Sequence, residues 1–67
     1  QGKFLFIYYR SAILFMMKKS ADGLLQLEMA LSKSTKWLKK FLKFYPEIIQ
    51  DNKVTELIGK YKKVKNG

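Results

Sequence analysis

The chain contains no cysteine and no histidine among its 67 residues. Without cysteine it forms no disulfide and offers no thiolate nucleophile, and without histidine it lacks an imidazole base. The usual ligands of a zinc site are absent as well. We therefore expect no metal and no cofactor. The lack of cysteine leaves the redox compartment open, because cysteine-free chains occur in the cytosol, the periplasm and secretions alike.

Acidic residues and glycine are also sparse. The chain has Lys+Arg 14 against Asp+Glu 5 and a formal net charge of +9. The carboxylates are scattered along the chain, where they suit helix caps and helix surfaces better than a paired acid and base. The glycines are isolated from one another, so there is no glycine-rich phosphate loop. These absences predict a protein that is not an enzyme.

Apolar residues, in contrast, are plentiful. Hydrophobic residues make up 48% of the chain and aromatic residues 15%, which is too many for a disordered tail. The length allows a single domain, 1–67, and a domain this small buries only about 60% of its unfolded surface. The spacing of apolar residues by threes and fours predicts an all-α fold, a small bundle of two to three amphipathic helices.

The most apolar stretch covers residues 4–9 and 12–17. A membrane span requires about 20 apolar residues, so a stretch interrupted by Arg10 is a poor candidate. It also lacks the small-residue cleavage site of a signal peptide. A β-hairpin would have to turn at Arg10 and Ser11, and neither residue favours a tight turn. We predict a helix near residues 3–19 that is apolar on all sides.

A second helix is predicted near residues 21–45. Ser20 and Asp22 are suited to its first turn, and its apolar residues recur every three or four positions. The polar residues 32–35 allow either a kink or a fresh start with Ser34 as the N-cap. We expect the helix to be mostly continuous through this stretch.

The end of the second helix is marked by Pro46, which disfavours helical geometry in the preceding residue. A proline at this position also begins helical turns readily, so residues 46–50 are expected to form a short turn. Asp51 or Asn52 then caps a third helix near residues 52–63.

One side of the predicted second helix is cationic and the other side is apolar. The cationic side consists of Lys33, Lys36, Lys39, Lys40 and Lys43. Trp37 and Phe44 lie on the border between the two sides, one heptad apart. Like charges at such spacings cost roughly 0.2 to 0.5 kcal/mol per pair. We therefore expect an anionic partner that relieves this repulsion.

Binding to an anionic membrane surface accounts for most of these features. Interfacial helices carry basic residues on the polar face and Trp, Phe and Leu on the other. The lysines would lie at the lipid headgroups, with Trp37 and Phe44 as interfacial anchors. The most concrete form is a secreted or membrane-associated antimicrobial or bacteriocin-like protein, whose apolar N-terminal helix enters the membrane after refolding. In the plainer alternative, the apolar side packs into the chain's own core and the lysines remain solvated.

Nonspecific nucleic-acid binding is another hypothesis. The net charge fits it, and Lys60, Lys62 and Lys63 surround Tyr61, so that an aromatic ring is interleaved with charge as in stacking surfaces. Arginine is the preferred residue for bidentate contacts to bases and phosphates, however, and Arg10 is the only one in the chain.

A third hypothesis is a small helical subunit, or a fragment, of a membrane or protein assembly. Methionine and aromatic residues are enriched at protein interfaces. The first helix offers Tyr8, Tyr9, Phe15, Met16 and Met17 for contact with a protein partner or with a second copy. The same side chains are also suited to the chain's own core, because a bundle this small must build its core from such residues.

Overall fold

The computed structural model describes residues 3–62, and every regular element in that range is helical. The elements are α1 (Lys3–Met16), α2 (Ser20–Lys33), α3 (Leu38–Phe44), the 3₁₀ helix η1 (Pro46–Gln50) and α4 (Asn52–Lys62). The all-α bundle predicted from the sequence is therefore confirmed.

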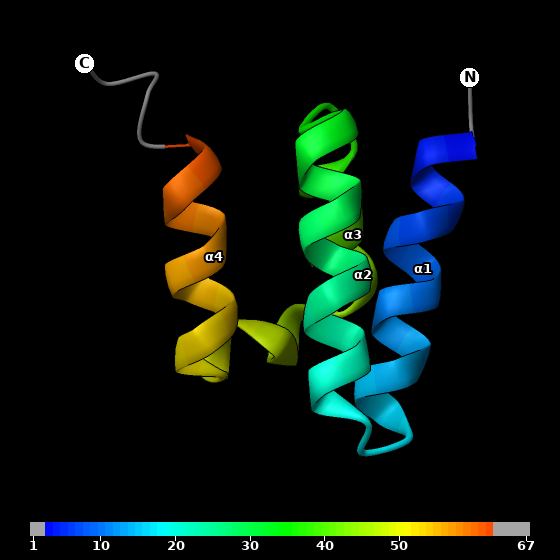
Figure 1. Ribbon diagram of the computed structural model, residues 1–67, viewed down its shortest axis with the longest axis vertical. Helices are drawn as coiled ribbons and strands as arrows, with labels where there is room; N and C mark the ends of the chain where they lie inside the picture. Colours follow the sequence, from blue (N-terminus) through cyan, green and yellow to red (C-terminus); the bar gives the residue numbers. More distant parts are fainter. Residues whose placement is uncertain (1–2, 63–67) are drawn as a thin grey trace.

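The helices alternate in direction along the chain (Figure 1). Helices α1 and α2 form an antiparallel hairpin, and α3 runs behind α2 in this view. The short η1 then carries the chain across to α4, which contacts α2 on the side away from α1. As a result, α2 and α4 run parallel to each other, with both N-termini at the lower end of the figure.

The core draws one or more side chains from every element. It consists of Tyr8, Ala12, Leu27, Ala30, Leu31, Leu38, Phe41, Ile48 and Val54. Several of the buried residues are small, and they let α1 and α2 approach closely. The buried hydroxyl of Ser11, for example, donates a hydrogen bond to the carbonyl oxygen of Gly23 across the hairpin at 2.8 Å. A Cβ atom on Gly23 would lie 2.8 Å from ring carbons of Phe15, so only glycine fits there without a shift.

The predicted continuous helix over residues 21–45 is wrong. Helix α2 ends at Lys33, and α3 begins only at Leu38. Ser34 has extended backbone geometry, with φ −167° and ψ 123°. Its carbonyl oxygen accepts a hydrogen bond from the Tyr8 hydroxyl, and its side-chain oxygen accepts one from the Lys36 N–H at 3.2 Å. The chain therefore breaks after α2 and starts a new helix, as in the alternative prediction. The residue that precedes α3 is Trp37, however, and not Ser34.

The predicted first helix is also too long at its C-terminal end. Helix α1 ends at Met16, and Lys18 adopts a positive φ of 66°. The Lys18 N–H donates to the carbonyl of Phe15 at 3.0 Å, and the Lys19 N–H donates to the carbonyl of Leu14 at 2.8 Å. This pair of bonds is the Schellman pattern, which closes a helix with one left-handed residue. Lys18 and Lys19 therefore form the turn that follows α1 and are not part of the helix.

The C-terminal part follows the prediction more closely. Pro46 is the first residue of η1, and the Asp51 carboxylate accepts a hydrogen bond from the Lys53 N–H at 2.9 Å, next to the start of α4. Val54 is buried, while Leu57 is partly buried and packs against the core. Of the predicted helix 52–63, the last residue lies outside the described residues.

Candidate functional site

All five lysines of the predicted cationic side are exposed, but they lie on three consecutive segments instead of one helix. Lys33 is in the last turn of α2, Lys36 is in the connection, and the remaining three are on α3. We call this set, Lys33, Lys36, Lys39, Lys40 and Lys43, the lysine face. On α3 the two buried residues are Leu38 and Phe41, so its lysines occupy the side of the helix turned away from the core.

The lysine face has no acidic partner within the described part of the chain. Neither aspartate nor glutamate occurs between Glu28 and Glu47. The single ion pair found within residues 3–62 joins the Lys60 ammonium to the Glu28 carboxylate at 3.8 Å and does not involve this face. The lysine face is consequently a concentrated positive charge on an exposed surface.

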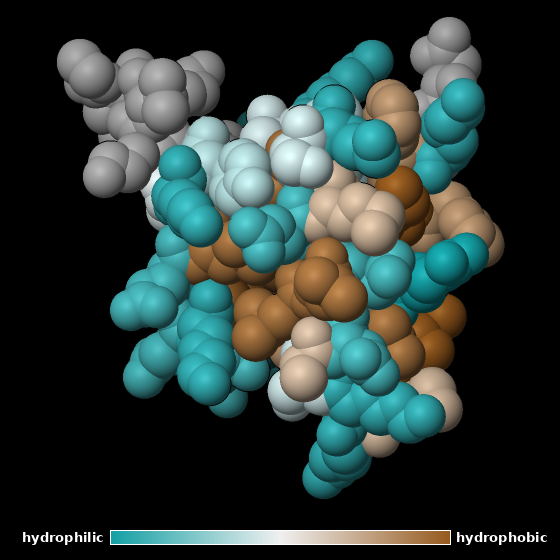
Figure 2. All heavy atoms as spheres, viewed as in Figure 1, coloured by the Kyte–Doolittle hydropathy of each residue, from teal (hydrophilic) through white to brown (hydrophobic). Residues whose placement is uncertain are grey.

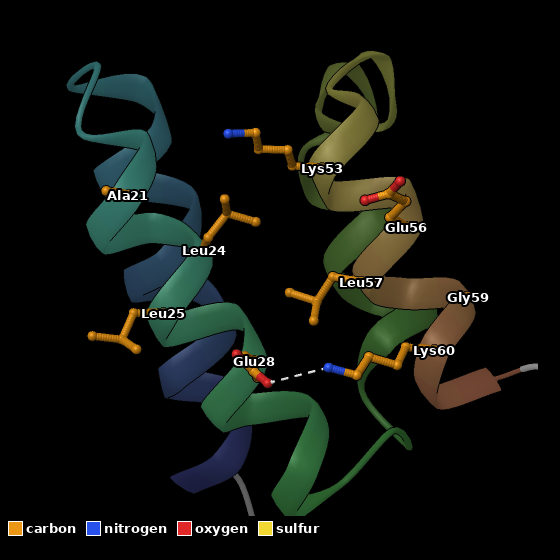
Figure 3. A pocket seen from close by; sticks show the side chains of 9 residues that line it. All are labelled: Ala21, Leu24, Leu25, Glu28, Lys53, Glu56, Leu57, Gly59 and Lys60. Carbon is orange, nitrogen blue, oxygen red and sulfur yellow. Dashed lines mark ion pairs between the residues drawn. The ribbon is translucent and has the colours of Figure 1, made fainter.

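The proposed nucleic-acid cluster near the C-terminus is separate from the lysine face. Lys60 points across to α2, where it pairs with Glu28 (Figure 3). The side chain of Lys62 and the whole of Lys63 lie outside the described residues. Within the described range, the structure therefore does not bring Lys60 together with the lysines of α3.

The two predicted anchors differ in their surroundings. Trp37 is half-buried against the core, and the Lys36 ammonium lies 5.2 Å from the centroid of its ring, a cation–π distance. Phe44 is 51% exposed, and its ring centroid lies 4.8 Å from that of Tyr9 on α1. The aromatic contact joins the outer surface of α1 to the edge of the lysine face.

The residues predicted as a partner interface do not all lie on the exposed surface. The prediction that Tyr8 contacts a partner is wrong, because Tyr8 is completely buried in the chain's own core. Its ring centroid lies there 5.5 Å from that of Phe41. Burial also raises the pKa of its hydroxyl to about 12. Phe15 is partly buried against the core. Met16 and Met17 remain exposed at 49% and 56%.

The outer side of α1 presents apolar residues that sequence reasoning did not single out. Phe6 and Ile13 are exposed at 59% and 51%, and together with Arg10 they follow a 4-3 spacing, which is one stripe of a helix surface. The Arg10 guanidinium lies 5.0 Å from the centroid of the Phe6 ring. The spacing was visible in the sequence, but a helix that is apolar on all sides does not reveal which stripe faces outward.

A groove with a volume of about 900 Å³ lies between α2 and α4 (Figure 3). It is lined by Ala21, Leu24, Leu25, Glu28, Lys53, Glu56, Leu57, Gly59 and Lys60. Figure 2 shows brown apolar side chains gathered between these two helices, with teal polar side chains around them. No pattern in the sequence indicated this groove, because it depends on how far η1 holds α4 from the rest of the bundle.

Two further features bear on what the site can bind. Within residues 3–62 no three carboxylates come together in a way that would hold a metal ion. In the same range, no helix has the length and apolar character that a membrane span needs.

Comparison of the chain with protein families, with characterised proteins and with solved structures finds no match to any of them.

Proposed function

We propose that the chain binds an anionic membrane surface through the lysine face, as a cationic, membrane-active protein. The single observation that carries this proposal is that all five lysines of the face are exposed and no carboxylate within residues 3–62 pairs with them. Each basic residue held near an anionic bilayer contributes about 1 kcal/mol of attraction. Several such residues on one side of a small protein are enough for peripheral binding.

Exposed apolar side chains next to the lysine face favour a membrane over a nucleic acid. Phe44 stands at the edge of the face and contacts Tyr9 of α1. Beyond this contact, α1 exposes Phe6, Ile13 and Met16, each of them about half accessible to solvent. A bilayer rewards burial of such groups in its interfacial region, whereas the phosphates of a nucleic acid do not. The lone arginine, Arg10, lies over Phe6 in this apolar stripe and is not part of the lysine face.

The structure modifies the geometry expected from the sequence. Trp37 is held against the core, so Phe44 is the better placed of the two anchors. In this proposal the folded bundle rests on the headgroups with α3 nearest the bilayer. Entry of α1 into the membrane would require Tyr8 and Ala12 to leave the core, and is a later step than binding.

Vesicle co-sedimentation at physiological salt tests the proposal. The variant Lys36→Gln, Lys39→Gln, Lys40→Gln removes three charges from the lysine face, and its affinity for anionic vesicles should fall by about 3 kcal/mol, roughly a hundredfold. The matched control Lys18→Gln, Lys19→Gln, Lys53→Gln removes the same number of charges from the α1–α2 turn and from α4. It should bind within about threefold of the unaltered chain, because surface charges act only within a Debye length.

Three outcomes would overturn the membrane proposal. Equal losses in the two variants would mean that net charge and not the lysine face governs binding. Equal binding to zwitterionic and anionic vesicles would remove the electrostatic basis. Absence of vesicle binding, together with tight binding to duplex DNA that weakens steeply with salt, would establish a nucleic acid as the partner. Far-UV circular dichroism of each variant checks that the helices are retained.

A further inference from the structure

The groove between α2 and α4 has apolar walls that the bundle itself leaves uncovered. Leu24 on α2 and Leu57 on α4 point toward each other across it (Figure 3). Leu25 also lines the groove, but its side chain points away from α4 in this view. Leu25 is 60% exposed, the highest value among the large apolar side chains of the described residues. Exposed apolar side chains that line a recess, with charged groups around them, are typical of an interaction surface.

The charges around the groove are balanced, unlike those of the chain as a whole. Two acidic residues, Glu28 and Glu56, and two basic residues, Lys53 and Lys60, line it. The whole chain has only five acidic residues and a formal net charge of +9. A surface with equal numbers of both charges can complement itself, whereas the lysine face can only repel its own copy.

We infer that a second copy of this chain covers the groove, in a two-fold symmetric dimer. Because α2 and α4 run parallel, a two-fold axis along them places α2 of each copy opposite α4 of the other. Leu24 then meets Leu57 of the second copy. Glu28 and Lys60 lie at one level of the groove, 3.8 Å apart, so the same rotation sets Glu28 of one copy against Lys60 of the other.

The charge of the groove favours a second copy over an anionic lipid or a nucleic acid. An anionic lipid or a nucleic acid would meet the carboxylates of Glu28 and Glu56 at the groove, although the lysine face is available elsewhere. A second copy meets balanced charge, and α3, which carries three lysines of the lysine face, lies behind α2 in Figure 1. Association also adds burial of apolar surface, which is a common way for small helical domains to gain stability.

Sedimentation equilibrium over a wide range of protein concentration, at physiological salt, tests the inference. The unaltered chain should change from monomer to dimer as concentration rises. Leu25→Lys places two like charges in the interface and should weaken the dimer at least about tenfold. Phe6→Lys is the matched control, because Phe6 is equally exposed, at 59% against 60%, but lies on the outer side of α1. Its dissociation constant should be unchanged.

A charge exchange tests the arrangement itself. Glu28→Lys should weaken the dimer, because the introduced ammonium group would face Lys60 of the second copy, and adding Lys60→Glu should restore it. The Glu28–Lys60 pair is largely exposed within one chain, so folding should survive both changes, as circular dichroism will show. A monomer at every concentration would overturn the inference. Equal effects of Leu25→Lys and Phe6→Lys, or no recovery in the double variant, would overturn it as well. None of these outcomes depends on membrane binding.

Discussion

Replacing Tyr8 with phenylalanine removes a single hydroxyl group from the centre of the fold. Tyr8 is fully buried, and its hydroxyl donates to the carbonyl oxygen of Ser34 at the break between α2 and α3. Losing such a hydrogen bond costs about 1 kcal/mol, because the carbonyl keeps no protein partner in its place. For a domain of this size, that cost lowers the Tm by about 4 to 8 °C. Thermal unfolding at neutral pH, followed by far-UV circular dichroism, measures the difference.

The pH dependence of the same variant gives a sharper test. Burial raises the pKa of Tyr8 to about 12 in the folded chain, from an ordinary value of 10.0. As the pH rises above about 10, the unfolded chain loses the Tyr8 proton first, so deprotonation favours unfolding. The stability contributed by this group is complete below about pH 10 and is lost between about pH 10 and 12, at about 1.36 kcal/mol per pH unit. Phenylalanine at this position does not titrate.

The two chains should therefore exchange their order of stability near pH 11. Below pH 10 the unaltered chain is more stable by about 1 kcal/mol. At about pH 11, the ionisation of Tyr8 in the unfolded state cancels that advantage. The lysines and the other tyrosines are common to both chains, so the difference isolates Tyr8. A stability difference that stays constant from pH 8 to pH 12 would refute the reasoning, because it would mean that Tyr8 is not buried.

Three further substitutions test the backbone. Gly59→Ala should stabilise the chain by up to about 1 kcal/mol, because a Cβ atom there meets nothing within 4 Å and glycine is unfavourable inside a helix. Gly23→Ala should instead destabilise it by about 1 kcal/mol or more, since its Cβ would lie 2.8 Å from the ring of Phe15. Lys18→Gly should stabilise it by about 1 kcal/mol, because Lys18 has a φ of 66°. Urea unfolding midpoints measure all three, and equal shifts for the two alanine variants would contradict the packing at Gly23.

The features that the sequence predicted correctly are those fixed by neighbouring residues. The helical class follows from apolar spacing, and the cap of α4 follows from Asp51, whose carboxylate bonds the Lys53 N–H. The end of the lysine-bearing helix at Pro46 is equally local, because proline restricts the residue before it. Each of these signals acts within one or two turns of chain, so a reading along the sequence captures it.

The features that the sequence did not predict depend on contacts between distant residues. The stretch around Ser34 was compatible with either a helix or a break, and the bond from Tyr8, 26 positions away, accompanies the break. The role of Tyr8 was missed for a related reason. Apolar residues surround α1, so periodicity did not identify which of them face inward. The groove was missed because the separation of α2 from α4 is set by η1 and by the burial of Ile48 and Val54.

The two proposed surfaces, taken together, make a prediction that neither makes alone. The groove joins two copies on the side opposite α3, so a dimer would carry its two lysine faces on opposite sides. One flat bilayer can reach only one of these faces, and the second remains free for another vesicle. The dimer should therefore cluster anionic vesicles, which light scattering detects. Leu25→Lys adds a positive charge, so it should bind vesicles at least as well as the unaltered chain and yet cluster them far less. If it clusters them equally, the lysine faces are not held back to back.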